Sequence, residues 1–479
     1  MTDNRQDTQG LPFAKPLDEA AIREFSSRVR GQLIRPEDDG FDEERTVFYG
    51  GFDRHPALIV RVKDATDISH VIALARESGL ELAVRSGGHS VAGHSTTDGG
   101  IVLDLSEMKN LELDVEGRTA WAQTGLTAGE YTAAAGAHGL ATGFGDTGSV
   151  GIGGITLGGG VGYLVRKHGL TIDDLISAEI VTADGELLRV DAETHPDLFW
   201  AIRGGGGNFG VATRFQFRLH EVSAIVGGML ILPATPEVIA SIVAEAEAAP
   251  EELSTIANVM TAPPMPFLPA EVHGELVIMA MLVYAGEDVE AGERVVAPFR
   301  ALPKPIVDMV KPMPYPEIYP PEEDDFHPTA VARTMFIDTI DRDVSQKILE
   351  YLRASDAPMR VAQIRVLGGA MARVSDQATA FAHRSSRIMV NVAAFYESPE
   401  DRAAREAWVS DFAAALRQGE GGAYVGFLGE EGEERVREAY PESTWDRLAE
   451  IKHRYDPTNL FRLNQNIPPA TVQKEAGDG

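Results

Sequence analysis

Two histidines in the segment Arg85–Ser95 have ring nitrogens that could do chemistry. The segment reads RSGGHSVAGHS, with His89 directly after two glycines and His94 five residues later. A neutral imidazole is a good nucleophile and a common metal ligand, and glycines let a flat ligand approach it closely. A zinc site built on His89 and His94 lacks nearby third ligands, so we predict no metal site. We interpret His94 as structural, whereas His89 either bonds a ligand or hydrogen-bonds within a turn.

Glycine is concentrated in two stretches of the chain. Residues 143–162 read GFGDTGSVGIGGITLGGGVG, with ten glycines in twenty positions, and residues 203–211 read RGGGGNFGV. Such density costs backbone entropy, so it indicates a chain that turns with positive φ or lies directly against a ligand. Successive bare N–H groups can hold a pyrophosphate. We therefore predict a flat, charged cofactor beside these stretches.

A nicotinamide cofactor is disfavoured by the order of the elements around the second stretch. Gly205, Gly207 and Gly210 formally match G-x-G-x-x-G, which needs a strand before it and a helix after it. Here HPDLFWAIR predicts a helix before the glycines and VATRFQFRL predicts a strand after them. A phosphate-binding G-x-x-x-x-G-K-[ST] segment is also absent, so the sequence favours neither a dinucleotide dehydrogenase nor a nucleotide triphosphatase.

The elements that must position these residues indicate two domains, as expected for a chain of 479 residues. From residue 55 to about 222, ALIVRV, DISHVIALARESG and LELAVRSGG predict a strand–helix–strand unit, and IVLDLSEM predicts a further strand. From residue 225 to about 418, the helical PEVIASIVAEAEAA alternates with strands such as GELVIMAMLVYAG. The pattern of this second region predicts a domain of α+β type.

Loops and the C-terminal tail complete the predicted organisation. The proline-rich APPMPFLPAE and KPMPYPEIYPPEEDD are expected to be surface loops. In the tail, STWDRLAEIKHRY predicts a helix, DPTN a turn and LFRLNQNI a strand. The sequence pattern of the tail is similar to that of the first domain. We therefore expect the chain to pass from the first domain to the second and then back to the first.

Composition narrows the partners. The net charge of −30 opposes binding to nucleic acid or to an anionic membrane surface. No apolar run is long enough to span a membrane, and the polar N-terminus has no signal-peptide core, so we expect a cytoplasmic protein. Zero cysteines exclude disulfides, thiolate metal sites and a cysteine nucleophile. The oligomeric state is not predictable from these features.

Several motifs together resemble one family of flavoproteins. They are RSGGH at 85–89, the glycine stretch at 143–162, HGL at 168–170, VTADG at 181–185, LFW at 198–200, RGGGGNFGV at 203–211, YDPTNLF at 455–461 and NQNI at 464–467. In order and spacing they resemble the berberine-bridge-enzyme branch of the vanillyl-alcohol-oxidase, or PCMH-type, flavoproteins. The match spans residues 50–222 and 420–468, and the middle region matches more loosely at LGGA (367–370) and TAFAHR (379–384).

The resemblance implies an α+β fold with two domains. A PCMH-type FAD-binding domain of two α/β subdomains would occupy residues 1–222, with its core at 51–222. A substrate-binding domain, an antiparallel sheet covered by helices, would occupy 223–420, and a berberine-bridge-like segment, 421–479, would return to the first domain. The implied cofactor is FAD, bonded covalently through the ring of His89. The implied FAD-binding residues are Arg85, Ser86, Gly87, Gly88, His89, Ser90, Thr147, Gly148, Val150, Gly151, Gly153, Gly154, Gly158, Gly162, Val181, Val211, Asn464 and Asn466.

Two positions assign the chain to a subgroup within that resemblance. Many members make a second flavin bond through a cysteine, and Thr147 stands at that place, where a hydroxyl cannot form the bond. The chain is therefore similar to members with a single histidyl tether and a more open site. Val150 stands where members are thought to control oxygen access, and a valine favours oxidase over dehydrogenase behaviour.

Catalysis in this family is hydride removal from a C–H next to oxygen or nitrogen, and an alcohol also needs a base. Many members carry the base in a Tyr-x-Asn-Tyr segment, but this chain has Tyr424 followed by Phe427 in place of the second tyrosine. Gln363 and Arg365 alternate on a predicted strand, MRVAQIRVL, and in the family this face looks onto the flavin. We predict Tyr424, Gln363 and Arg365 as catalytic candidates, with Tyr440 a weaker one; each is otherwise a structural residue.

The leading hypothesis is an FAD-dependent oxidase that acts on a small alcohol, amine or sugar-like molecule and passes electrons to O2, giving H2O2. The alternative, motivated by Phe427, is an FAD-dependent dehydrogenase or a flavin-binding protein whose activity is lost or non-oxidative.

Overall fold

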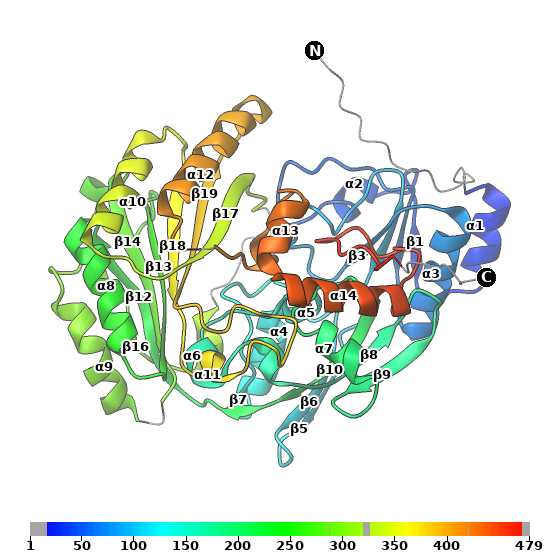
Figure 1. Cartoon of the computed structure of the whole chain (residues 1–479), viewed down its shortest axis with the longest axis horizontal. Helices are drawn as coiled ribbons and strands as arrows, with labels where there is room; N and C mark the ends of the chain where they lie inside the picture. Colours follow the sequence, from blue (N-terminus) through cyan, green and yellow to red (C-terminus); the bar gives the residue numbers. More distant parts are fainter. Residues whose placement is uncertain (1–16, 287, 320–325, 420, 472–479) are drawn as a thin grey trace, which may run out of the picture.

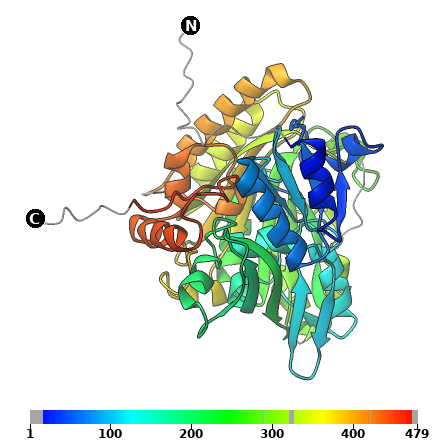
Figure 2. The ribbon, with the colours of Figure 1, turned by 90° about the vertical axis from the view of Figure 1, so that its right-hand side faces the viewer.

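The computed structural model describes residues 17–286, 288–319, 326–419 and 421–471, and it confirms the α+β class. Three layers of sheet are visible in Figure 1, two small ones at the right and a large one at the left. In the view turned by 90°, the N-terminal elements (blue) lie to the right and the C-terminal helices (orange and red) lie to the left (Figure 2). None of the described helices is both long enough and apolar enough to cross a membrane.

The first small sheet carries the strand that ends at the RSGGH motif. Its order is β1-β2-β4-β3, with β2, β4 and β3 parallel and β1 antiparallel to β2. The predicted strand–helix–strand unit exists, but β4 lies between its two strands. The elements of this part are α1 (Glu19–Ser26), β1 (Gln32–Ile34), α2 (Phe41–Glu44), β2 (Leu58–Arg61), α3 (Ala65–Ser78), β3 (Leu82–Arg85) and β4 (Ile101–Asp104).

The second small sheet is antiparallel, in the order β5-β6-β10-β8-β9. As predicted, a helix precedes the glycines at 203–211 and a strand follows them. The strands are β5 (Leu111–Asp114), β6 (Thr119–Gln123), β8 (Leu175–Val181), β9 (Leu187–Asp191) and β10 (Val211–Arg218), with β7 (Leu140–Ala141) paired to β11 (His220–Glu221). The helices are α4 (Ala128–Gly136), α5 (Ile152–Gly158), α6 (Val165–His168), η1 (Thr171–Asp173) and α7 (Pro196–Ala201).

The second domain is one antiparallel sheet, covered by helices on one face. The strand path is β15-β12-β14-β13-β18-β19-β17, with β16 beside β12. The strands are β12 (Ile225–Pro233), β13 (Leu253–Thr261), β14 (Leu276–Tyr284), β15 (Val307–Asp308), β16 (Lys311–Met313), β17 (Ala330–Ile337), β18 (Arg360–Val366) and β19 (Ile388–Phe395). The other elements are α8 (Pro236–Ala248), η2 (Ala270–Val272), α9 (Val289–Ala301), η3 (Tyr315–Ile318), α10 (Arg342–Ala354), α11 (Ala370–Arg373), η4 (Pro399–Asp401) and α12 (Arg402–Leu416).

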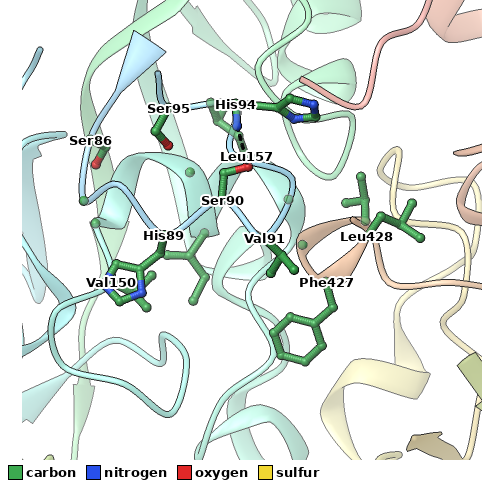
Figure 3. A pocket seen from close by; sticks show the side chains of 18 of the residues that line it. Ser86, His89, Ser90, Val91, His94, Ser95, Val150, Leu157, Phe427 and Leu428 are labelled. Atoms are coloured by element: carbon green, nitrogen blue, oxygen red, sulfur yellow. Dashed lines mark hydrogen bonds between the residues drawn. The ribbon is translucent and has the colours of Figure 1, made fainter. Parts of the chain in front are cut away.

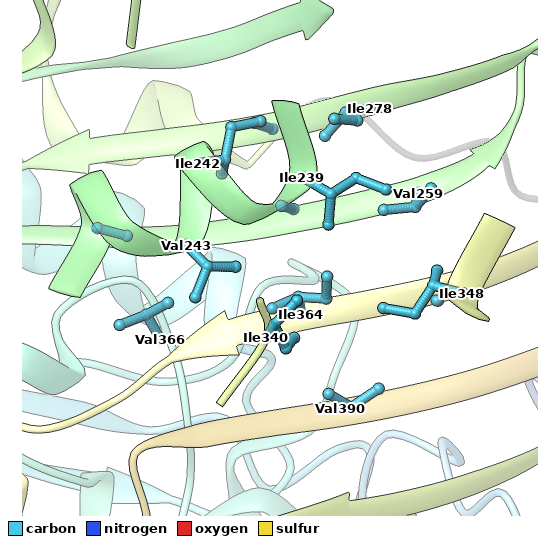
Figure 4. Packing of buried hydrophobic residues seen from close by; sticks show 14 of the residues in the cluster. Ile239, Ile242, Val243, Val259, Ile278, Ile340, Ile348, Ile364, Val366 and Val390 are labelled. Carbon is cyan, nitrogen blue, oxygen red and sulfur yellow. The ribbon is translucent and has the colours of Figure 1, made fainter. Parts of the chain in front are cut away.

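The largest apolar core lies between this sheet and its helices. Ile239 and Ile242 of α8 meet Val259, Ile278 and Ile364 of the sheet (Figure 4). Because side chains alternate along a strand, the residues between these apolar ones point to the opposite face, toward the first domain. That uncovered face is what the second domain offers to the site.

One segment predicted to be a loop contains regular structure. In KPMPYPEIYPPEEDD, residues 311–313 form β16 and residues 315–318 form η3. Tyr315 is fully buried in an apolar cluster with Tyr163 and Ile318. This packing orders the segment around residue 315. Residues 320–325 of this segment lie outside the described residues.

The tail was predicted to end in a strand, and that prediction is wrong. The helices η5 (Val425–Phe427), α13 (Glu433–Ala439) and α14 (Glu442–Tyr455) form, but residues 460–467 have no strand. Their backbone bonds side chains instead of a ladder. Asp456 accepts from the N–H groups of Leu460 and Phe461 at 2.8 Å, and Asn208 accepts from the N–H of Ile467 at 3.0 Å. The tail packs on the first domain, where α14 contacts α7.

Two buried arginines join the domains. Arg384, which is 1% exposed, donates to both carboxylate oxygens of Asp173 at 2.7 and 2.8 Å. Arg166 of α6 donates to the carbonyl of Ala246 in α8 at 2.6 Å. Bidentate and carbonyl-capping contacts of this kind fix orientation as well as position.

Candidate functional site

His89 stands on the loop that leaves β3. Its ring stacks on Phe48, with centroids 3.9 Å apart, and its Nε2 lies 2.9 Å from Ser149 Oγ of the glycine stretch. Gly88 before it has φ +74°, a conformation that favours glycine. The ring is therefore held between two segments far apart in the sequence.

The two glycine-bearing loops touch through their backbones. A Cβ added to Gly87 would collide with the backbone of Gly151, and one added to Gly151 would collide with Gly87. The glycines at 87 and 151 are therefore required by close approach. At Gly154 and Gly207 a Cβ would meet no atom within 4 Å, although both residues line a cavity. There the bare backbone faces open space.

This cavity has a volume of about 480 Å³ and lies between the domains. Figure 3 shows His89 and Val150 on one side of it and Phe427 and Leu428 on the other. Of the predicted cofactor-binding residues, it is lined by Ser86, Gly87, Gly88, His89, Ser90, Thr147, Val150, Gly151, Gly153, Gly154, Gly158, Val211 and Asn464. The pocket size and mixed lining are typical of a cofactor or ligand site.

Five predicted cofactor-binding residues do not line the cavity. They are Arg85, Gly148, Gly162, Val181 and Asn466. Arg85 is buried and donates to Asp104 at 2.8 Å, so it braces β3 against β4. Gly162 lies against the carbonyl of Phe144, where a Cβ has no room, and Val181 belongs to an apolar core. Arg85, Gly162 and Val181 therefore have structural contacts outside the cavity.

Gln363 and Arg365 of β18 line the cavity and share one face, as their spacing predicts. Arg365 is buried and donates to Asp146 at 2.6 Å, to Gln363 Oε1 at 2.7 Å and to the carbonyl of Val161 at 2.9 Å. Gln363 Nε2 donates to Asn258 Oδ1 at 3.1 Å. The guanidinium is therefore fixed by both domains.

The tyrosine candidates are engaged in structural contacts. Tyr424 lines the cavity, but its phenol oxygen accepts from the N–H of Gly160 at 3.1 Å, and burial raises its pKa. Tyr440 does not line the cavity; its hydroxyl donates to the carbonyl of Gly204 at 3.0 Å, and burial also raises its pKa. A phenol with a raised pKa is a poor proton acceptor at neutral pH.

Several cavity residues were not among the predicted site residues, although Asp146, Phe461 and Gln465 lie inside the motifs quoted from the sequence. They include Phe48 and Tyr49, Asp146 beside the predicted Thr147, Asn391 of β19, and Phe461 and Gln465 of the tail. Asn391 lies opposite Gln363 on the neighbouring strand. Strand pairing therefore brings Asn391 to the site, and no local sequence pattern reveals that pairing. Asp146 is adjacent to the predicted residue Thr147. A carboxylate within the glycine stretch was the only sequence feature that could have indicated a role for Asp146.

His94 also lines the cavity, and burial, with a smaller effect of the Arg54 charge, lowers its pKa to about 4. Between pH 6.5 and 4, His94 is protonated in the unfolded chain but stays neutral in the folded protein. Because the unfolded state binds more protons, the free energy of unfolding falls as the pH falls. The loss from this group is about 3 kcal/mol at pH 4.

We expect His94→Gln to reduce that acid sensitivity. The measurement is the free energy of unfolding in urea at pH 7 and at pH 4.5, for the wild type and for His94→Gln. A variant that loses as much stability as the wild type between the two values would contradict the assignment.

Comparison with known proteins identifies the family. The family model described as "FAD binding domain" matches residues 56–191, and "Berberine and berberine like" matches residues 423–468. The chain is 30% identical to (R)-6-hydroxynicotine oxidase of Paenarthrobacter nicotinovorans over 92% of this chain and 97% of the relative. The chain belongs to the berberine bridge enzyme-like family of FAD-linked oxidoreductases.

Solved structures agree with that membership. The crystal structure of 6-hydroxy-D-nicotine oxidase from Arthrobacter nicotinovorans has a TM-score of 0.81 at 27% identity, covering 92% of this chain and 98% of that one. Xylooligosaccharide oxidase from Myceliophthora thermophila in complex with xylobiose has a TM-score of 0.82 at 24% identity, covering 94% and 100%, which shows the shared fold. The PCMH-type, two-domain fold predicted from the sequence is confirmed.

The residues present fit FAD. The bare backbone at Gly154 and Gly207 leaves room for a flat ring system or a pyrophosphate. The imidazole of His89 lies beside this backbone, with Nε2 2.9 Å from Ser149 Oγ. The chain is therefore an FAD-dependent oxidoreductase, and the cavity between the domains is its candidate site.

Proposed function

We propose that this flavoprotein is an oxidase with FAD bonded covalently to His89, acting on a small organic molecule. The substrate loses a hydride from a carbon next to oxygen or nitrogen, and O2 is the final electron acceptor, giving H2O2. One observation carries the proposal: a single cavity receives both His89 from the glycine loops and the polar face of β18 from the second domain. When bound, FAD supplies the two-electron acceptor.

The polar residues of the second domain favour a neutral substrate with hydroxyl or amine groups. Gln363 and Asn391 stand side by side on the adjacent strands β18 and β19, and both line the cavity. Amide side chains both donate and accept hydrogen bonds, which suits such groups. Arg365 is already neutralised by Asp146, so the cavity offers no uncommitted guanidinium for a carboxylate among the described residues.

Oxidase behaviour depends on access of O2, which we assign to Val150 in the cavity wall. We expect Val150→Ile to slow reoxidation of the reduced flavin by about tenfold, equal to about 1.4 kcal/mol in barrier height, because the added methyl narrows the approach. Stopped-flow mixing of photoreduced protein with air-saturated buffer measures this. An unchanged reoxidation rate would remove Val150 from the role.

The proposal is tested by a peroxide-release screen on protein whose visible spectrum has first been recorded. The probes are (R)-6-hydroxynicotine, xylobiose, glucose and benzyl alcohol. We expect at least one class to give H2O2 in proportion to O2 consumed. Flavin that is reduced by a probe but is not reoxidised by air would indicate a dehydrogenase, and flavin that no probe reduces would contradict the proposed function.

A further inference from the structure

The proposed oxidation leaves a proton without an acceptor. When a hydride leaves the carbon of an alcohol, the hydroxyl proton must go to a base within hydrogen-bond reach. Burial raises the pKa values of four tyrosines whose phenols feel the charge of Asp146: Tyr49, Tyr163, Tyr319 and Tyr424. The pKa of Tyr49 is raised to about 12. In each of the four tyrosines the charge of Asp146 adds to the increase.

Asp146 is the one carboxylate among the described residues that line the cavity. Its side chain is 25% exposed, whereas that of its partner Arg365 is 4% exposed. Arg365 Nη2 donates to Asp146 Oδ2 at 2.6 Å, and no described residue donates to Oδ1. One oxygen is therefore held by the cation while the other remains available to a ligand.

The loop around Asp146 is fixed by contacts from both domains. Tyr319 donates to the carbonyl of Gly145 at 3.0 Å, and Tyr163 donates to that of Asp146 at 3.3 Å. Three residues further on, Ser149 contacts the ring of His89. The carboxylate therefore stands on the same short loop as the contact to the proposed flavin attachment point. A fixed donor set and a fixed loop are what a positioned base requires.

We propose that Asp146 is the general base of the reaction, and that Arg365, held by Gln363, is its positioning residue. This rests on the proposed oxidase function. As the hydride and its electron pair leave the substrate carbon for the flavin, the substrate O–H bond breaks, its proton passes to Asp146 Oδ1 and the C=O bond forms. The proton then leaves to solvent, and O2 takes the two electrons with two protons to give H2O2. The substrate class is a neutral molecule with a hydroxyl on the oxidised carbon.

The experiment compares anaerobic flavin reduction by xylobiose, glucose and benzyl alcohol in the wild type and in Asp146→Asn. We expect the variant to bind FAD and to reoxidise in air as the wild type does, but to be reduced at least a hundredfold more slowly. A variant reduced at the wild-type rate would overturn the base assignment and leave the oxidase proposal standing.

A charge-balanced variant separates the base from the ion pair. Asp146→Asn leaves Arg365 buried and unpaired, whereas Asp146→Asn with Arg365→Gln removes both charges. If Asp146 acts only by neutralising Arg365, the double variant regains a fast rate, which contradicts the proposal. We expect it to remain as slow as the single variant.

Chemical rescue supplies a readout beyond turnover. Asp146→Ala opens a hole beside the Arg365 guanidinium, so sodium formate should raise the melting temperature of this variant but not of the wild type. The same formate should restore flavin reduction. Formate that stabilises the variant without restoring reduction would contradict the proposal. Wild-type flavin that (R)-6-hydroxynicotine reduces but the three alcohols do not would contradict this inference and leave the oxidase proposal standing. Wild-type flavin that none of the four probes reduces would defeat both.

Discussion

His89→Ala should yield protein whose flavin is completely released by acid, whereas wild-type flavin should precipitate with the polypeptide. Without the imidazole, the glycine loops can still hold FAD by backbone contacts, so we expect bound but extractable flavin. An attached ring nitrogen withdraws electrons and makes a flavin a stronger oxidant. We therefore also expect reduction of the bound flavin to be slower by about one to two orders of magnitude, or about 1.4 to 2.7 kcal/mol. Acid precipitation followed by the visible spectrum of pellet and supernatant measures the first effect.

His94→Gln is the matched control, because it changes a second histidine that lines the same cavity. At neutral pH this variant should keep its flavin in the acid pellet. If the two variants behave alike, either both retaining or both losing acid-stable flavin, His89 is not the specific attachment point.

Lys452→Met should be strongly destabilising and should weaken retention of FAD. The Lys452 ammonium is fully buried and donates to Asp456 at 2.6 Å and to the carbonyls of Asn208 at 2.7 Å and Phe461 at 3.1 Å. Burial lowers its pKa, and the Asp456 charge opposes that change. Removing one partner of a buried ion pair costs about 3 to 5 kcal/mol, because the other charge is left uncompensated. The free energy of unfolding in urea is the measurement.

The same contacts order the tail that lines the cavity through Phe461 and Gln465, so extractable flavin should increase in a His89→Ala background. Lys63→Met is a surface control, since that side chain is 56% exposed, and it should change stability by less than about 0.5 kcal/mol. Equal effects of the two lysine substitutions would mean that the buried pair does not hold the tail.

The sequence revealed the parts of the site that depend on local backbone chemistry. Glycines that must approach another backbone, such as Gly87, stand out by composition alone. The alternation of Gln363 and Arg365 places them on one face because the period of a strand is two residues. His89 was recognisable because it follows two glycines in a motif of known order.

Residues brought together by long-range pairing were not predictable. Asp146 becomes a candidate base only because Arg365, 219 residues away, reaches its carboxylate. Phe48 precedes the glycine motifs and carries no pattern, yet it stacks on His89. The prediction of a strand at LFRLNQNI was wrong for a related reason, namely contacts with side chains outside that segment. Its alternating apolar residues fit a strand, but Asp456 and Asn208 take up its backbone N–H groups.

The central claim is that one FAD is bonded to the ring of His89. Intact-mass spectrometry of the acid-denatured protein tests it most directly, with peptide mapping of the tryptic fragment that contains residue 89. The account predicts the polypeptide mass increased by one FAD, with the added mass on that fragment. A denatured protein at the unmodified mass, isolated from a yellow preparation, would contradict it.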